Sequence, residues 1–234
     1  VFDLPMVFAK YDGDTIDAVL NGEDSAFHKD MATAYENANF HLLGFLQNAT
    51  YRLTTANKDL STLADFKGLQ IRTMENANHM AFWTAIGAEP TPLAWPEVYF
   101  ALQSGTIAAQ ENAADTCVGA NFQEVQKYLA CTNHILYCNQ ICMSKQAWDE
   151  LDPAYQAALN QAVNEAIAEM RPQLESIDQE NKQKLVDGGM QLIEYSNDFY
   201  DEVLAVQGVQ DLYTKIDGDV NGLATTLQES LANA

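Results

Sequence analysis

One amphipathic pattern of more than 30 residues constrains the fold of this chain more than any other feature. Asp152 and Pro153 open the pattern with an N-cap residue and a proline at the first helical position, and Gly188 closes it. Apolar residues recur between them at helical spacing: Tyr155, Leu159, Val163, Ile167, Met170, Leu174 and Ile177. The spacing predicts a helix that is long for a globular protein, and Pro172 predicts a kink near 168–172.

The rest of the chain alternates between short strand and helix patterns. We expect strands over 40–46, 50–54, 69–72, 106–112, 135–143 and 191–195. We expect helices over 24–38, 76–86, 96–105, 144–151, 197–216 and 219–232, with an extended connector at 90–92. Strands that alternate with helices in this way predict the α/β class.

Composition excludes several classes of protein. Apolar residues make up 47% of the chain, which argues against disorder, and 33 acidic residues against 12 basic ones give a net charge of −21. This charge argues against binding to nucleic acid or to anionic lipid. No apolar run reaches the ~18 residues of a membrane span, and the first residues do not resemble a targeting segment. Phosphate-binding and hydrolase motifs are also absent from the sequence.

Four cysteines lie between residues 117 and 142, together with His134. The set Cys131, His134, Cys138 and Cys142 has the residue types of a zinc site, so a metal-assisted enzyme is one alternative. On the strand expected over 135–143, however, Cys138 and Cys142 would lie about 13 Å apart, too far to share a zinc ion or a disulfide. We therefore expect buried free thiols, and we leave a disulfide between Cys117 and Cys131 open.

Arginine is scarce, and two of the three arginines accompany predicted strands. Arg52 lies within one strand, and Arg72 ends another directly before a turn into a helix. Ligands of open α/β sheets bind beyond the carboxyl ends of strands, and guanidinium suits bidentate binding of a carboxylate. The alternative for each arginine is an ion pair with one of the many acidic residues.

Two further residues are candidates for the same site. Trp95 occupies an expected N-cap position before Pro96, where a small polar residue is usual, which suggests an aromatic wall of a cleft. Core packing is the alternative for this tryptophan. Asn112 ends the predicted strand at 106–112, where its amide could donate to a ligand oxygen; the alternative is an ordinary turn residue.

An ordered series of segments resembles the solute-binding proteins of tripartite ATP-independent periplasmic (TRAP) transporters, of the DctP type. The series consists of Leu63-Ala64-Asp65-Phe66-Lys67-Gly68-Leu69-Gln70-Ile71-Arg72, Gly87-Ala88-Glu89-Pro90-Thr91-Pro92-Leu93, Glu97-Val98-Tyr99-Phe100-Ala101-Leu102-Gln103-Ser104-Gly105, Gln110-Glu111-Asn112, Glu124-Val125-Gln126-Lys127-Tyr128 and Thr132-Asn133-His134. The flanks fit as well, so the resemblance covers the whole chain. One departure is Ala108-Ala109, where the family usually has Asp-Gly.

The resemblance implies a periplasmic-binding-protein fold, type II-like. Two α/β lobes would close on a ligand, and the long kinked helix would span both. Residues 1–49 and 138–177 would belong to lobe I, and residues 50–137 and 178–234 to lobe II. Family members carry a further strand–helix–strand–helix segment ahead of the position of Leu4, so we expect the N-terminal strands of lobe I to be missing from this chain.

The resemblance also implies a binding function without catalysis or a cofactor. Arg72 matches the family's arginine that forms a salt bridge with the ligand carboxylate, and Arg52 matches a second basic contact. The expected ligand contacts are Arg72, Arg52, Asn112, Trp95, Glu75 and Asn139, with Tyr137 close to the last.

The expected protein is exported to the periplasm or another extracytoplasmic space, binds a small organic acid, and delivers it to a TRAP membrane permease. Trp95 suggests a ligand with an apolar or planar part, and Glu75 would suit hydroxyl groups or an amine. A solute-binding protein of the ABC type, which shares the fold, is the second alternative.

Overall fold

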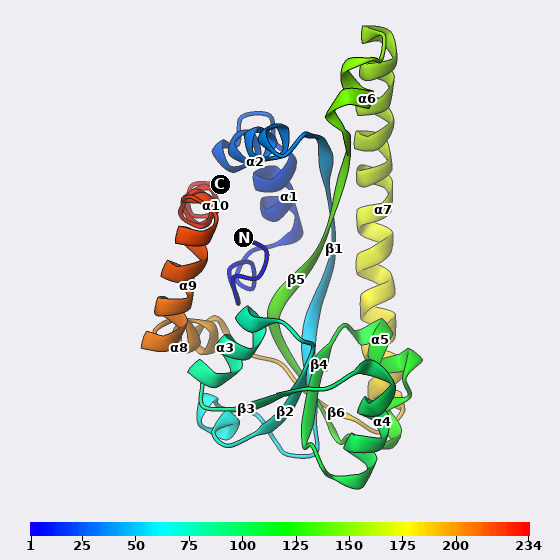
Figure 1. Ribbon diagram of the computed structural model, residues 1–234. Coiled ribbons are helices and arrows are strands. Elements are labelled where there is room, and N and C mark those ends of the chain that lie inside the picture. The colour runs from blue at the N-terminus through cyan, green and yellow to red at the C-terminus, as the bar shows by residue number, and fades with distance from the viewer.

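The computed structural model describes residues 1–47 and 50–234, and in these residues the strands form one mixed sheet (Figure 1). The strands are β1 (Phe40–Ala56), β2 (Gln70–Thr73), β3 (Glu89–Pro92), β4 (Ala109–Asn112), β5 (Tyr128–Ser144) and β6 (Gln191–Ile193), in the order β3-β2-β4-β1-β5-β6. Strand β1 pairs with β4 and β5 antiparallel, whereas β2 pairs with β3 and β4 parallel. Parallel pairing also joins β5 to β6.

Helices surround this sheet, which confirms the α/β class. They are α1 (Gly13–Asn21), α2 (Ala26–Asn37), α3 (Ala77–Ala85), α4 (Trp95–Ser104), α5 (Ala114–Gly119), α6 (Lys145–Asp149), α7 (Pro153–Asp187), α8 (Asn197–Leu204), α9 (Gln207–Asp219) and α10 (Leu223–Ala232). Two short 3₁₀ turns, η1 (Leu63–Phe66) and η2 (Phe122–Glu124), complete the elements. Figure 1 shows α7 along one side of β1 and β5, with α1, α2 and α8 to α10 on the other side.

The long helix is present, as the sequence pattern predicts. Helix α7 has 35 residues, and the Asp152 carboxylate accepts a hydrogen bond from the Ala154 N–H at 2.9 Å as its N-cap. Pro172 lies inside the helix without ending it, and the kink stays a prediction. Gly44 of β1 allows α7 to approach closely, because a Cβ atom there would lie 2.8 Å from the Cδ1 atom of Ile167.

The two strands expected over 40–46 and 50–54 are a single strand, so the prediction of two separate strands was wrong. Strand β5 also begins at Tyr128, earlier than the 135–143 pattern indicates. The two strands have 17 residues each and pair along most of their length, with register shifts such as that between Leu42 and Gly44. Strand β5 pairs with β1 both before and after the register shift between Gln47 and Tyr51, so one partner strand serves both expected segments.

Other element boundaries also differ from the sequence-based expectation. The connector expected at 90–92 is the edge strand β3, where proline is tolerated because one side of the strand is unpaired. The N-cap of α4 is Ala94, so Trp95 is the first residue of the helix and not its N-cap. The helix expected over 197–216 ends at Leu204, because the chain turns where the Val206 N–H donates to the Val203 carbonyl. Strand β4 begins at Ala109 instead of residue 106.

Two hydrophobic clusters form the core. The larger cluster joins the N-terminal segment, α2, α3 and α8 to α10, and includes Phe27, Phe45, Phe66 and Trp83. The smaller one lies between β1, α4, α5 and the end of α7. The larger cluster includes residues assigned by the sequence to both lobes, and the lobe boundaries themselves stay predictions.

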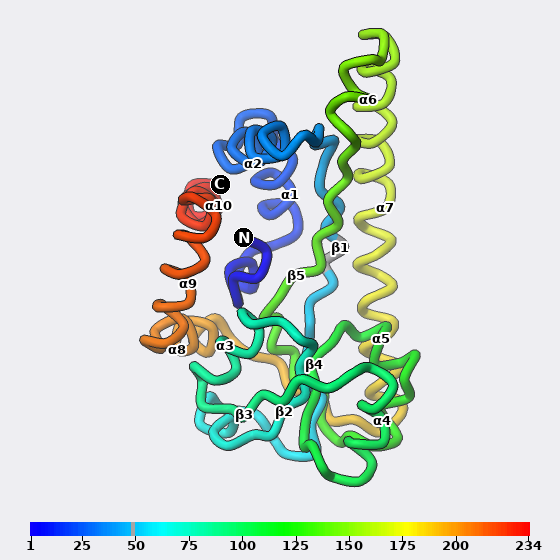
Figure 2. The backbone as a smooth tube through the Cα atoms, viewed as in Figure 1, coloured from blue at the N-terminus to red at the C-terminus, as the bar shows by residue number. Residues whose placement is uncertain are grey.

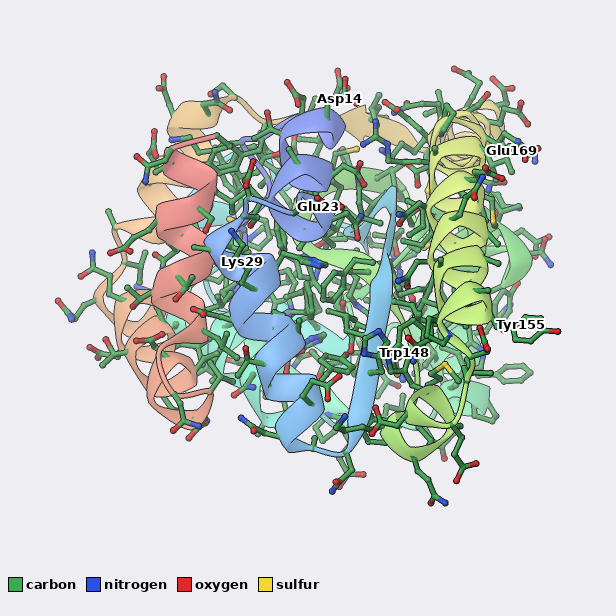
Figure 3. All side chains as sticks on the ribbon, turned by 90° about the horizontal axis from the view of Figure 1, so that it is seen from above. Asp14, Glu23, Lys29, Trp148, Tyr155 and Glu169 are labelled. Atoms are coloured by element: carbon green, nitrogen blue, oxygen red, sulfur yellow. The ribbon has the colours of Figure 1, made fainter. Side chains whose placement is uncertain are left out.

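The surface is strongly acidic. Figure 3 labels three exposed acidic residues: Asp14 on α1, Glu23 just after α1, and Glu169 on α7. Among the described residues, no helix is both long enough and apolar enough to cross a membrane.

Candidate functional site

The site residues lie on three adjacent strands, β2, β4 and β1. In the sheet register, Arg72 of β2 is opposite Gln110 of β4, and Leu53 of β1 is opposite Asn112. The carboxyl ends of the parallel strands β2 and β4 therefore meet at one edge of the sheet, the usual ligand position in α/β folds. The two predicted arginines lie on opposite sides of β4 and not on adjacent strands.

Arg72 is a buried cation without an acidic partner. Its residue is 5% exposed, and its Nε atom donates a hydrogen bond to the Leu93 carbonyl at 2.9 Å. Among the described residues, Arg72 takes part in no ion pair, whereas Arg52 and Arg171 both do. Burial lowers the pKa of the Arg72 guanidinium, and the Glu111 carboxylate opposes this shift. An anionic ligand would supply the charge that this guanidinium lacks.

Arg52 is paired inside the protein. Its Nε and Nη2 atoms donate to both carboxylate oxygens of Glu111, and Nη2 also donates to the Glu111 carbonyl at 3.1 Å. Both side chains are buried. Burial alone would lower the pKa of Arg52, but the Glu111 carboxylate outweighs this effect and raises it. The structure thus shows the ion-pair alternative for Arg52, and its contact with a ligand stays a prediction.

Glu111 anchors a polar network below the edge of the sheet. The Glu111 carboxylate lies 3.1 Å from His134 Nε2, and His134 Nδ1 lies 2.9 Å from the Thr132 hydroxyl, which contacts Thr54 at 3.1 Å. Burial raises the pKa of Glu111, but its partners His134 and Arg52 lower it to about 2. Burial lowers the pKa of His134, opposed by Glu111. The sequence analysis missed this network. The feature that could have indicated it is Glu111 itself, an acidic residue within an expected strand, because a buried carboxylate requires a cationic partner.

Asn112 is oriented by the same network. Its Oδ1 atom accepts hydrogen bonds from the Tyr137 hydroxyl and the Ala113 N–H, both at 3.2 Å. The Tyr137 hydroxyl in turn accepts from Arg52 Nη1 at 2.7 Å. With its oxygen occupied, Asn112 has its amide NH₂ without a hydrogen-bond partner among the described residues. The amide is therefore held in place with its donors free of these contacts, and its predicted contact with a ligand oxygen stays a prediction.

Trp95 is packed on one side and exposed on the other, and its role as a wall of a ligand cleft stays a prediction. Its ring packs edge-to-face on Phe122 with centroids 5.8 Å apart, and the Arg72 guanidinium carbon lies 5.6 Å from the ring centroid. The residue remains 41% exposed. Trp95 is thus anchored by packing and presents open aromatic surface beside the unpaired guanidinium.

The remaining predicted contacts lie at exposed positions. Glu75 is exposed on the turn between β2 and α3. Asn139 is exposed on β5, opposite Leu46 of β1. Within residues 1–47 and 50–234 no observed contact joins either residue to Arg72, and their roles stay predictions.

The cysteines do not assemble a metal centre within the described part of the chain. All four are free thiols; Cys117 and Cys131 are buried as expected, but Cys138 is only partly buried and Cys142 is exposed. His134 uses its ring nitrogens for Thr132 and Glu111. Residues 1–47 and 50–234 contain no group of three or more His, Cys, Asp or Glu side chains that could hold a metal ion. The residues named as zinc ligands for a metal-assisted enzyme therefore do not form a metal site in the described part of the chain.

Comparison with known families tests the resemblance directly. The family described as bacterial extracellular solute-binding protein, family 7 (DctP), matches residues 1–216. The chain belongs to this family. The family 7 proteins are a class of binding proteins, and residues 1–216 include every predicted contact residue.

Individual relatives agree with this assignment. The 2,3-diketo-L-gulonate-binding periplasmic protein YiaO of Escherichia coli is 30% identical over 197 residues, which cover 82% of this chain and 58% of YiaO. A TRAP periplasmic solute-binding protein from Ochrobactrum anthropi superposes with a TM-score of 0.88 at 27% identity, covering 100% of this chain and 72% of that structure. A TRAP protein from Chromohalobacter salexigens with bound D-glucuronate gives a TM-score of 0.80 at 25% identity, covering 98% and 74%. These structures support the fold with its long helix.

The chain spans only part of these relatives. It covers 56% of a solute-binding protein from Verminephrobacter eiseniae and 58% of YiaO.

Proposed function

We propose that this family 7 protein is an extracytoplasmic solute-binding protein that captures a small organic carboxylate for a TRAP membrane permease. The observation that carries this proposal is Arg72, a buried guanidinium without an ion pair among the described residues, at the ligand edge of an α/β sheet. The proposed location is the periplasm, because YiaO and the C4-dicarboxylate-binding protein DctP of Vibrio cholerae are periplasmic proteins by name.

Each site residue has a defined task in this proposal. The Nη atoms of Arg72 bind the ligand carboxylate, because a guanidinium can donate two parallel hydrogen bonds to it. The Asn112 amide donates to a second ligand oxygen, and its orientation is fixed because Tyr137 and Ala113 occupy its own oxygen. Trp95 covers an apolar or C–H face of the ligand. Contacts that form only with the ligand present would shift the population toward a closed state that the permease recognises.

The relatives bind ligands of the proposed class. YiaO is described as binding 2,3-diketo-L-gulonate, and the C. salexigens structure contains D-glucuronate. Both ligands are small sugar acids with a carboxylate group. Their chemistry suits a site built from one guanidinium, one amide and one aromatic ring.

Isothermal titration calorimetry against a panel of small carboxylates and the corresponding neutral alcohols tests this function. We expect binding of one or more carboxylates and none of the alcohols. Arg72→Ala should weaken binding by about 30-fold or more, because loss of one partner of a buried charge pair costs about 2 kcal/mol or more.

Arg171→Ala is the matched control. Unlike Arg72, Arg171 is ion-paired, with Asp14 and Asp17, and these contacts join α7 to α1 away from the site. This variant should retain the wild-type affinity within about twofold. Unchanged carboxylate affinity in Arg72→Ala, or binding of the neutral alcohols, would contradict the proposed function.

A further inference from the structure

Tyr137 of β5 joins Arg52 of β1 to Asn112 of β4. Its hydroxyl accepts a hydrogen bond from Arg52 Nη1 at 2.7 Å and donates one to Asn112 Oδ1 at 3.2 Å. In the sheet order, β1 lies between β4 and β5, and Figure 2 shows the backbones of these three strands coming together. The hydrogen bond between Tyr137 and Asn112 therefore spans the strand that separates them.

The direction of each hydrogen bond in this chain is fixed. A guanidinium can only donate, so the Tyr137 hydroxyl accepts from Arg52 and keeps its own proton for Asn112. Burial raises the pKa of Tyr137 against the opposing effect of Arg52, so the phenol holds this proton at neutral pH. The Ala113 N–H, 3.2 Å from Asn112 Oδ1, is also a donor only. Two donors therefore select the amide oxygen of Asn112 and turn its NH₂ group away from them.

The chain of hydrogen bonds begins at a buried charge pair. Arg52 Nη2 donates to Glu111 Oε1 at 2.8 Å, and the Arg52 guanidinium carbon lies 5.6 Å from the centroid of the Tyr137 ring. A hydroxyl that accepts from a cation becomes a stronger donor, and an amide whose oxygen accepts hydrogen bonds becomes a stronger N–H donor. Each hydrogen bond of the chain therefore strengthens the next one, as far as the Asn112 NH₂ group.

From this arrangement we infer that Tyr137 is a positioning residue for carboxylate binding, which acts through Asn112 and does not itself donate to the ligand. The inference rests on the proposed function, in which the Asn112 amide donates to a ligand oxygen. The Tyr137 hydroxyl has one proton, and Asn112 Oδ1 accepts it. The hydroxyl therefore orients and polarises the amide, and the amide makes the contact.

Nuclear magnetic resonance of the ligand-free protein tests the hydrogen-bond chain. The nitrogen and proton signals of the Asn112 side-chain NH₂ group are assigned by their loss in Asn112→Ala. In Tyr137→Phe, which removes only the hydroxyl, these signals should shift upfield, because the amide is less polarised when its oxygen loses one donor. Tyr35→Phe is the matched control, since the Tyr35 hydroxyl also donates to a side-chain amide oxygen, that of Gln140, at 2.7 Å. It should leave the Asn112 signals in place.

A double-mutant cycle tests the effect on binding. The probe for calorimetry is D-glucuronate, or the tightest carboxylate of the panel if D-glucuronate does not bind. Tyr137→Phe should weaken binding by about fivefold in the wild-type background, which corresponds to one hydrogen bond. In the Asn112→Ala background the same change should weaken binding by less than about twofold, because the residue through which Tyr137 acts is gone. Tyr35→Phe should stay within about twofold in both backgrounds.

The outcomes separate this inference from the proposed function. Unmoved Asn112 signals in Tyr137→Phe would overturn the inference, whichever carboxylate binds. An equal loss of affinity in both backgrounds would show that Tyr137 contacts the carboxylate ligand directly, and no loss in either would show that it has no role; both results overturn the inference while carboxylate capture stands. Absence of binding by every carboxylate would overturn the proposed function itself, and with it the role of Tyr137 in binding. Shifted signals together with a loss confined to the wild-type background would support the inference.

Discussion

The substitution Glu111→Gln gives the sharpest test of how the site is held together. Glu111 is fully buried, and it compensates the Arg52 guanidinium, whose side chain is 7% exposed. Glutamine keeps the shape of the side chain but removes its charge. The variant therefore leaves a buried cation without a counter-charge, a change that costs about 3 to 5 kcal/mol of folding free energy.

Thermal unfolding followed by circular dichroism measures this loss. For a chain of 234 residues, each kcal/mol corresponds to about 2 to 4 °C in melting temperature, so the variant should melt about 6 to 20 °C below wild type. Asp14→Asn is the matched control, because it removes one of the two acidic partners of Arg171, and the Asp14 side chain is 89% exposed. We expect this control to cost about 1 kcal/mol at most.

The reasoning would be refuted if the two variants were equally stable. A loss below about 1 kcal/mol in Glu111→Gln would mean that water or structural relaxation compensates Arg52 without its carboxylate. Arg52 would then be available as a second ligand cation, contrary to its ion pair with Glu111.

Two further predictions concern Trp95 and His134. Trp95→Ala should weaken carboxylate binding by about tenfold in calorimetry through lost aromatic contact, and unchanged affinity would show that the exposed ring does not touch the ligand. Because burial lowers the pKa of His134 in the folded state, its contribution to stability is complete above its unfolded pKa of about 6.5 and is lost as the pH falls below that value. Between pH 8 and pH 5.5, the free energy of unfolding measured in urea should decrease less for His134→Gln than for wild type. Equal decreases would show that His134 is not the source of this pH dependence.

Much of the fold could be predicted because local patterns carry it. The N-cap at Asp152, the proline that follows it and the apolar repeat define α7, and the structure confirms the helix. The sequence-based predictions fail where contacts with residues distant in the chain determine the structure. Strand β1 is continuous because β5 pairs along it, and the end of α8 depends on a turn at Val206 that carries no glycine or proline.

The same difference between local and distant contacts separates the site residues that could be predicted from those that could not. Arg72 could be found from the sequence because it ends a strand directly before a helix. The buried network of Arg52, Glu111 and His134 could not, because its members are far apart in the chain: Arg52 lies 59 residues before Glu111, and Glu111 lies 23 residues before His134. Tyr137 was named only as a neighbour of Asn139, and its hydrogen bond with Arg52, 85 residues away, could not be predicted.

The sequence by itself determined the α/β alternation, the long helix and the residues that accompany the strand ends, because each depends on spacing over a few turns. The tertiary structure alone decided which arginine carries the free charge. Arg52 and Arg72 have the same chemistry and similar local surroundings, but among the residues that the structure describes only Arg52 lies within hydrogen-bond distance of a buried carboxylate. The strand order β2-β4-β1 places Glu111 between the two arginines, and its carboxylate binds Arg52. No local pattern in the sequence indicates which of the two arginines Glu111 pairs with.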